Sequence, residues 1–252
     1  MKNFNALDTK NKIVAWIKDW FNENGSNCNA IIGLSGGKDS AIVAALCVEA
    51  LGNDRVIGVT IPNTTQTSKN TLDKDMLDVE KLVKELNITL ITIPIASAYS
   101  DIIDNIGKAL KTDVTEQTKI NLSPRLRMAT LYAVSQSLNG RVANTCNLSE
   151  EYVGYSTRWG DNVGDFAPIA DFTVTELLEI GKTLNISYDL ISKIPADGLC
   201  GKTDEDNLGF KYSDLDKYIR TGICDDDNVK KLIDEKHSKN LFKLKKIPKF
   251  NF

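Results

Sequence analysis

The sequence predicts an α/β protein whose core is a doubly wound, mostly parallel sheet flanked by helices, with extra helices and loops in the C-terminal third. Short apolar runs rich in β-branched residues recur along the first 145 residues, and segments with the spacing of amphipathic helices separate them. Beyond about residue 150, Gly, Asp and Asn become frequent and the helical segments become shorter. Strands that alternate with helices of this length indicate a Rossmann-like sheet.

Four apolar runs, each bounded by turn residues, are the expected strands. They cover residues 29–34, 56–61, 88–93 and 141–145. In a parallel sheet of this kind, ligands bind at the carboxyl ends of the strands. We therefore expect a site at that edge.

Helical spacing predicts three long helices, at 39–51, 71–86 and 125–138, and two shorter ones, at 174–184 and 214–220. Residues 160–165 and 196–209 are expected to be long functional loops, since loops of this size in compact domains usually bind a ligand or lack fixed structure. The lysine-rich end, 236–249, has two interpretations. It is a solvated tail, or it folds over an anionic ligand.

Composition excludes several classes of function. A net charge of -3 gives little electrostatic support for binding long nucleic acid. No segment approaches the roughly 18 apolar residues of a membrane span, and the N-terminal residues lack the apolar stretch of a signal peptide, so we expect a cytoplasmic protein without a membrane partner. The five cysteines form no C-x-x-C pair, and His237 is the single histidine. Chemistry should therefore rest on carboxylates, cations and backbone dipoles.

The segment Ser35 to Ser40, SGGKDS, follows the first expected strand and opens the first expected helix. Gly36 and Gly37 allow backbone conformations that expose N–H groups to an anion, and the two serines add hydroxyl donors. The positive end of the helix dipole favours phosphate at the same place. The spacing differs from both the G-x-x-x-x-G-K-[ST] loop and the G-x-G-x-x-G pattern.

Asp39 is the discordant residue of this loop, because a carboxylate repels phosphates unless a cation lies between them. Mg²⁺ prefers oxygen ligands from carboxylates and phosphates, so we expect this ion at Asp39. The alternative is a glycine-rich turn in which Asp39 or Ser40 only caps the helix. Lys38 has two interpretations. Its positive charge stabilises the bound phosphates, or its side chain faces solvent.

Ser35 to Ser40 resembles the signature loop of the ATP pyrophosphatases. These enzymes share a doubly wound sheet and cleave ATP between the α and β phosphates while they adenylate a substrate oxygen. The loop alone does not select a member of the group, which includes GMP synthetase, asparagine synthetase and tRNA-modifying enzymes.

Three further stretches are similar in order and spacing to the ammonia-dependent NAD synthetases, namely 123–128 (SPRLRM), 144–165 (NTCNLSEEYVGYSTRWGDNVGD) and 202–216. The similarity covers nearly the whole chain. It implies a single domain, with an ATP-binding core at 26–150 and substrate loops, helices and the basic end at 151–252.

The resemblance also implies the residues of the site. Asp39 and Glu150 would be the catalytic residues and hold Mg²⁺. ATP would contact Gly33, Leu34, Ser35, Gly36, Gly37, Lys38, Asp39, Ser40 and Thr145. Deamido-NAD (nicotinic acid adenine dinucleotide) would contact Arg125, Arg158, Asp165 and Lys243.

Three of the implied residues also have an ordinary structural interpretation. Glu150 at a helix start favours the helix dipole, Arg125 suits a helix surface, and Asp165 suits a turn. The chain departs from the family pattern at Val174, where a lysine is frequent, at Ala196, where serine or threonine is frequent, and at Phe242, where histidine is frequent.

The expected reaction is the ATP-dependent amidation of deamido-NAD with ammonia, which gives NAD, AMP and pyrophosphate through an acyl-adenylate. We expect ammonia as the nitrogen source because the synthetase pattern takes up the 252 residues and leaves none for a glutaminase. The family implies a homodimer. The alternatives are another ATP pyrophosphatase-type ligase or, in view of the three departures, a nucleotide-binding protein without catalysis.

Overall fold

The computed structural model describes residues 4–193 and 203–250 and has a parallel sheet at its centre. The strands are β1 (Asn29–Gly33), β2 (Val56–Thr60), β3 (Thr89–Thr92) and β4 (Gly140–Ala143). They lie in the order β3-β2-β1-β4, and every neighbouring pair is parallel. The predicted fold class is confirmed, and each predicted strand agrees to within two residues at either end.

The predicted helices are all present. They are α2 (Lys38–Leu51), α3 (Lys69–Leu86), α5 (Glu116–Ser137), α7 (Val174–Gly181) and α10 (Tyr212–Thr221). Helix α5 begins at Glu116, well before the predicted start at residue 125. Thr115 caps it, because its hydroxyl accepts a hydrogen bond from the Thr118 N–H. Pro124 lies inside this helix, which tolerates the loss of one backbone donor.

Several helices were not predicted. They are α1 (Ala6–Asn24), η1 (Asn53–Arg55), α4 (Ala96–Leu110), α6 (Leu148–Val153), α8 (Tyr188–Ile191), α9 (Asp204–Leu208) and α11 (Asp227–Leu244). Helix α9 lies in the predicted loop 196–209, whose residues 196–202, including Ala196, are outside the described residues. Residues 236–244 of the lysine-rich end are helical, because they belong to α11. The folding of this end over an anionic ligand stays a prediction.

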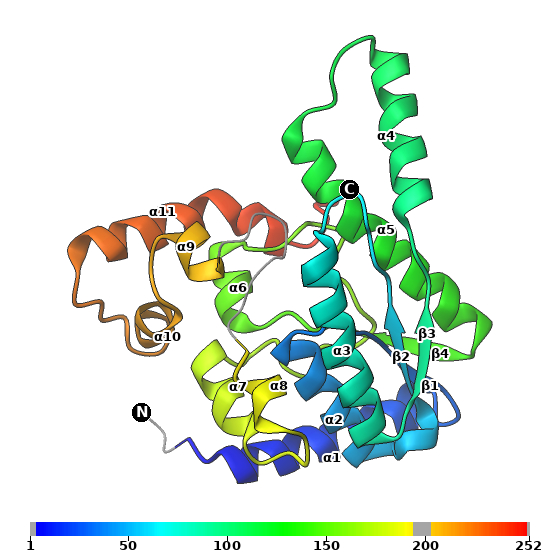
Figure 1. The fold of residues 1–252 in the computed structure, drawn as a ribbon. Helices are drawn as coiled ribbons and strands as arrows, with labels where there is room; N and C mark the ends of the chain where they lie inside the picture. Colours follow the sequence, from blue (N-terminus) through cyan, green and yellow to red (C-terminus); the bar gives the residue numbers. More distant parts are fainter. Residues whose placement is uncertain (1–3, 194–202, 251–252) are drawn as a thin grey trace.

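Helices cover both faces of the sheet (Figure 1), and alternate residues of β1 are buried against them. Ala30 and Ile32 are buried among residues of α1, α2 and α3, whereas Ile31 is buried on the opposite face, near α5. Helix α2 is apolar over most of its surface because α1 covers the side that points away from the sheet. The phosphate loop therefore leads into a helix that is packed between α1 and the sheet.

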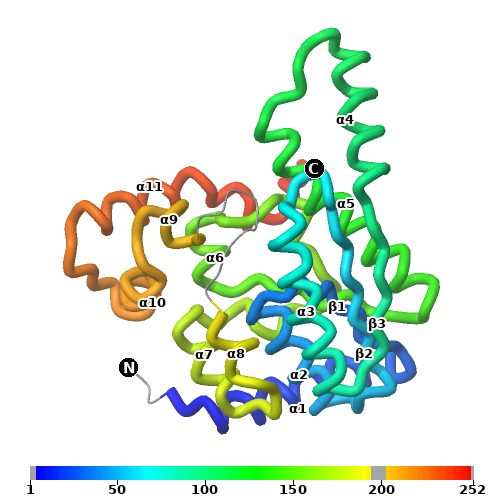
Figure 2. Tube along the Cα trace, in the orientation of Figure 1, coloured from blue at the N-terminus to red at the C-terminus, as the bar shows by residue number. Residues whose placement is uncertain are grey.

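A second, smaller core lies beside the sheet core and joins α6, α7, α9, α10 and α11 (Figure 2). Its members are buried apolar and aromatic side chains. They are Val153, Val174, Leu208, Phe210, Tyr212, Leu215 and Ile233. Among the described residues, no helix is long and apolar enough to cross a membrane.

The strand order reverses between β1 and β4. The chain passes outward from β1 through β2 to β3 and then returns to add β4 on the other side of β1. The connections after β1 and β4 therefore diverge at the carboxyl edge of the sheet, which is where parallel α/β sheets bind their ligands. Residues 34–37 follow β1 at this point, and residues 144–147 follow β4.

Candidate active site

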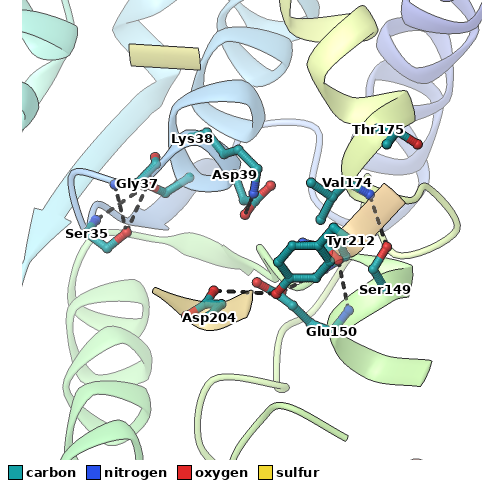
Figure 3. Close-up of polar contacts among 12 residues, drawn as sticks. Ser35, Gly37, Lys38, Asp39, Ser149, Glu150, Val174, Thr175, Asp204 and Tyr212 are labelled. Atoms are coloured by element: carbon teal, nitrogen blue, oxygen red, sulfur yellow. Dashed lines mark hydrogen bonds and ion pairs between the residues drawn. The ribbon is translucent and has the colours of Figure 1, made fainter. Parts of the chain in front are cut away.

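The loop after β1 gathers polar donors around one small space (Figure 3). The Gly37 N–H donates to Ser35 Oγ at 3.2 Å, and the Ser35 N–H donates to Ser40 Oγ at 3.4 Å. The Ser40 hydroxyl donates to the Gly37 carbonyl at 3.0 Å. The two hydroxyls and the Gly37 N–H thus lie together at the start of α2, as the sequence predicts for an anion-binding loop.

The N-terminus of α2 is open to an anion. Gly37 is its N-cap residue and supplies no side chain that accepts a hydrogen bond from the first turn. The first N–H groups of a helix have no partner within it, and the helix dipole favours negative charge there. Gly33 and Leu34 lead into this loop, and the Leu34 N–H donates to the Val59 carbonyl of β2 at 2.8 Å.

Asp39 lies in the first turn of α2 and shares its environment with Lys38 and Glu150 (Figure 3). Lys38 is buried, and its Nζ lies 2.7 Å from Asp39 Oδ2. Burial lowers the pKa of Lys38, but Asp39 and Glu150 outweigh it, so the pKa of this ammonium is raised and it stays charged. The solvent-facing alternative for Lys38 is therefore wrong.

Glu150 reaches the site from α6, just after β4. The side chain of Asn147 accepts from the Glu150 N–H at 3.0 Å, and Glu150 Oε2 accepts from the Asn147 N–H at 3.3 Å, which forms a capping box. Burial of its carboxyl group and the nearby Asp39 raise the pKa of Glu150 to about 8. The carboxyl group therefore both caps the helix and faces a second carboxylate.

Two carboxyl groups with surplus acceptor capacity meet at this point. Asp39 Oδ1 is buried without a hydrogen-bond partner among the described residues. Residues 4–193 and 203–250 contain no group of three or more His, Cys, Asp or Glu side chains that could hold a metal. Mg²⁺ typically takes one or two carboxylates and completes its shell with phosphates and water, so Asp39 and Glu150 fit this ion.

The sequence prediction missed two residues beside this carboxylate pair, Asp204 and Tyr212 (Figure 3). The Tyr212 hydroxyl donates to Asp204 Oδ2 at 3.4 Å, and both side chains are buried. Burial and the carboxylates of Glu150 and Asp204 raise the pKa of Tyr212, which keeps its hydroxyl protonated. A capping pattern, Thr203 to Asp206, is the signal in the sequence that marks a helix at this place.

Val174 occupies the first turn of α7 and is a core residue. Its N–H donates to Ser149 Oγ at 3.0 Å, and the next N–H, of Thr175, donates to Asp216 Oδ2 at 2.8 Å. An apolar side chain of the second core therefore stands at the position where the resemblance implied a lysine. Lys38 is the buried cation that lies among the carboxylates instead.

A second group of cations surrounds the segment 154–159. Lys243 of α11 donates to the carbonyls of Gly154 and Ser156 at 2.7 and 2.9 Å, and Arg125 Nε of α5 donates to the Arg158 carbonyl at 3.3 Å. Burial lowers the pKa of Lys243. The structure therefore brings together Arg125, Arg158 and Lys243, which the sequence assigns to one substrate.

The Arg158 guanidinium lies between two aromatic rings, with its Cζ 5.0 Å from the Trp159 ring centre and 5.6 Å from that of Phe242. Arg158 Nε is buried and has no hydrogen-bond partner within the described part of the chain. Trp159 has φ 61°, an unusual left-handed conformation for a bulky residue. Such conformations concentrate at functional sites.

Asp165 and Thr145 flank the end of β4. Asp165 Oδ2 accepts from the Val142 N–H at 2.7 Å, and Oδ1 accepts from the Tyr132 hydroxyl at 3.4 Å. Burial and Asp165 raise the pKa of Tyr132 to about 12. Asp165 thus holds the returning loop 160–165 against β4, while Thr145 lies two residues beyond the strand. The ligand roles of both stay predictions.

Comparison with known proteins identifies relatives over nearly the whole chain. The family model described as NAD synthase matches residues 9–251. The NH(3)-dependent NAD(+) synthetase of Methanocaldococcus jannaschii is 37% identical over 83% of this chain and 79% of its own length.

Two solved structures are similar over almost their full length. The NMN synthetase of Francisella tularensis has a TM-score of 0.89 and 31% identity, and the match covers 99% of this chain and 100% of that one. The NH3-dependent NAD synthetase of Campylobacter jejuni, solved with a nitrate ion, has a TM-score of 0.76 and 27% identity, with 98% and 100% coverage.

Proposed function

The chain belongs to the NAD synthase family, and from this premise we propose that it is an ammonia-dependent ligase that makes NAD from deamido-NAD with the consumption of ATP. The observation that carries the proposal is the proximity of the SGGKDS loop to Glu150 where the strand order reverses between β1 and β4. A phosphate-binding loop and a carboxylate pair at a strand-order reversal are suited to a reaction at the phosphates of ATP.

The proposed reaction has two steps. The nicotinate carboxylate attacks the α-phosphorus of ATP and expels pyrophosphate, which leaves an acyl-adenylate. Ammonia then attacks the activated carbonyl, and AMP leaves with one oxygen of the original carboxylate. The protein positions the reactants and offsets the charge on the phosphates through the loop N–H groups, Lys38 and the helix dipole.

We assign ATP to Gly33, Leu34, Ser35, Gly36, Gly37, Lys38, Asp39, Ser40 and Thr145. Asp39 and Glu150 would hold Mg²⁺, which supplies charge neutralisation at the leaving pyrophosphate. Arg125, Arg158, Asp165 and Lys243 are assigned to deamido-NAD, since three cations around one segment suit its phosphates and carboxylate. Residues 26–150 then carry the ATP-binding core together with Arg125, and residues 151–252 carry the other contacts to deamido-NAD, within one domain.

The direct test is to incubate the purified protein with ATP, Mg²⁺, ammonium and deamido-NAD. The proposal expects NAD, AMP and pyrophosphate in equal amounts. ATP binding without any of these products would instead support the nucleotide-binding alternative.

A second candidate function is the amidation of nicotinic acid mononucleotide to NMN. The observation that favours it is the TM-score of 0.89 to the Francisella tularensis NMN synthetase over the whole of both chains. The chemistry at the carboxylate is the same, and the substrates differ by one AMP unit. Measuring kcat/KM for the mononucleotide and the dinucleotide in the same assay decides between them, because the physiological substrate should have the larger value.

Phe242 gives a test of the assigned substrate-binding group. Its ring covers one face of the Arg158 guanidinium, so Phe242→Ala removes the packing that holds this cation in place. Since a cation–π contact is worth about 0.5–2 kcal/mol, we expect the KM for the pyridine nucleotide to rise roughly two- to thirtyfold, with the KM for ATP unchanged. Leu241→Ala, at the exposed neighbouring position, is the control. Equal effects of the two substitutions on both KM values would contradict the assignment.

We also infer a homodimer that uses an apolar surface depression between β3 and α5. The depression has the aliphatic side chains of β3 on one side and those of α5 on the other. Its lining residues are Ile91, Ile93, Leu126, Ala129, Thr130, Ala133, Val134, Ser137 and Leu138. An exposed apolar face at a sheet edge is a frequent association site, and Arg125 adjoins it on α5. The substrate site would then lie near the subunit boundary.

The dimer predicts that light scattering gives a molar mass near twice the 27.8 kDa of one chain. Ala133→Arg places a charge in this depression and should yield monomers. Ala15→Arg introduces the same side chain at an exposed position of α1 and should leave the dimer intact. A monomeric wild-type protein, or a dimer that persists in Ala133→Arg, would refute this surface as the interface.

A further inference from the structure

Lys193 ties three separate parts of the chain together beside the phosphate loop. It lies two residues after α8, and its Nζ donates to the Gly36 carbonyl at 2.9 Å. The same ammonium donates to Asp75 Oδ1 at 2.8 Å and to Asp78 Oδ2 at 2.6 Å, both from α3. Its side chain is 23% exposed.

The ammonium of Lys193 has no donor to spare for a phosphate. A lysine ammonium has three N–H donors, and three acceptors surround this one. Burial lowers the pKa of Lys193, but the hydrogen bonds to Asp75 and Asp78 outweigh it and raise the pKa, so the group is charged. Any influence on a bound nucleotide therefore passes through the Gly36 carbonyl.

Because a peptide bond is planar, the hydrogen bond from Lys193 to the Gly36 carbonyl also fixes the direction of the next N–H group. In a trans peptide, the carbonyl oxygen and the following N–H point to opposite sides. The described residues include no cis peptide bond. Because the Gly36 carbonyl points to Lys193, the Gly37 N–H points the other way, where Ser35 Oγ accepts it at 3.2 Å. That is the side on which the hydroxyls gather.

Helix α3 confines the same peptide. Gly36 has φ 77°, and a Cβ at this position would lie 2.7 Å from the Asp75 carbonyl oxygen. The loop backbone is thus packed against α3 while Lys193 holds the carbonyl from the side of α8. Three parts of the chain together fix one peptide plane.

We propose that Lys193 is a positioning residue that orients the Gly36–Gly37 peptide, so that the Gly37 N–H and the Ser35 hydroxyl that accepts from it lie on the side of the loop that faces the pyrophosphate of bound ATP. Asp75 and Asp78 hold Lys193 in turn. The inference rests on the proposed function in that it takes ATP as the ligand of the loop. It adds a residue that acts on ATP affinity without touching the nucleotide.

A salt bridge elsewhere in the same two helices provides a matched control. Lys81 of α3 contacts Asp189 of α8 at 2.6 Å and does not contact the phosphate loop. If Lys193 only held the α8 segment against α3, loss of Lys81 would weaken ATP binding as much as loss of Lys193. If Lys193 orients the loop, only its own loss affects phosphate binding.

The experiment is calorimetric titration of Lys193→Met, Lys81→Met and the wild-type protein with ATP and with AMP, both with Mg²⁺. A hydrogen bond to a charged group is worth about 1.5–3 kcal/mol, so Lys193→Met should raise the Kd for ATP roughly ten- to a hundredfold. The Kd for AMP, which lacks the pyrophosphate, should not change. Lys81→Met should bind both nucleotides as the wild type does.

Lys193→Arg serves as a second variant should Lys193→Met fail to fold. It keeps a cation between Asp75 and Asp78, but a planar guanidinium cannot reproduce the three-way set of donors, so ATP binding should still weaken. Equal ATP affinities in the Lys193 variants and Lys81→Met, with tight binding by the wild type, would overturn this inference alone. A wild-type protein that does not bind ATP would overturn the proposed function and this inference with it.

Discussion

Replacing Asp39 by Asn should lower the rate of pyrophosphate release from ATP and deamido-NAD by about a hundredfold or more. The substitution preserves the shape of the side chain but removes the negative charge that the proposed Mg²⁺ site requires. Asp39 Oδ1 is a buried atom that lacks a hydrogen-bond partner in the described chain, so it is available to a cation. The amide also weakens the hold on the buried ammonium of Lys38.

Asp19→Asn is the matched control for this substitution, because Asp19 is an exposed residue of α1. We expect wild-type rates from it. Thermal unfolding of the Asp39 variant, followed with and without Mg²⁺-ATP, separates a loss of metal binding from a loss of folding. An Asp39→Asn enzyme that releases pyrophosphate at the wild-type rate would show that the metal assignment is wrong.

Gly36→Ala should abolish measurable ATP binding, or weaken it by about two orders of magnitude. The added Cβ would lie 2.7 Å from the Asp75 carbonyl oxygen and 2.9 Å from Asp75 Cα. Both are backbone atoms of α3, which cannot move aside as a flexible side chain can. The left-handed φ of 77° adds a cost of about 1–3 kcal/mol for a residue with a side chain. The loop must therefore move, and its N–H groups lose their orientation toward the phosphates. Calorimetric titration with ATP measures the effect.

Gly52→Ala separates backbone strain from the clash. Gly52 also has a left-handed φ, of 85°, but a Cβ there meets nothing within 4 Å. This variant should lower thermal stability through strain alone, and so by less than Gly36→Ala, and it should still bind ATP normally. Equal ATP affinity in Gly36→Ala and Gly52→Ala would contradict the account of the loop.

The sequence predicted the sheet and the phosphate loop well because both depend on local pattern. Apolar runs marked all four strands, and the order strand, glycine-rich turn, helix marked the loop. The boundaries of α5 were predicted less well, since Pro124 conceals the continuity of that helix. Helix α11 was missed because it is rich in lysine and buries a single side chain, that of Ile233.

The site residues that belong to a sequence motif could be predicted. Those that reach the site only through tertiary packing could not. Asp39 belongs to the SGGKDS loop itself, and Glu150 was implied by the family resemblance of 144–165. The structure places them in α2 and α6, the helices that follow β1 and β4. Tyr212 and Lys193 reach the same region from the C-terminal third, across separations in sequence that no local pattern encodes. Their roles depend on how α8, α9 and α10 dock, which only the folded structure reveals.

The most direct test of the account follows the oxygen atoms of the substrate. Deamido-NAD with an isotopically heavy nicotinate carboxylate is converted with ATP and ammonium, and the AMP is analysed by mass spectrometry. Formation of an acyl-adenylate predicts one heavy oxygen in AMP, because the attacking carboxylate oxygen stays on the α-phosphorus when ammonia displaces it. AMP without the heavy isotope, alongside normal formation of NAD, would contradict attack by the carboxylate on ATP.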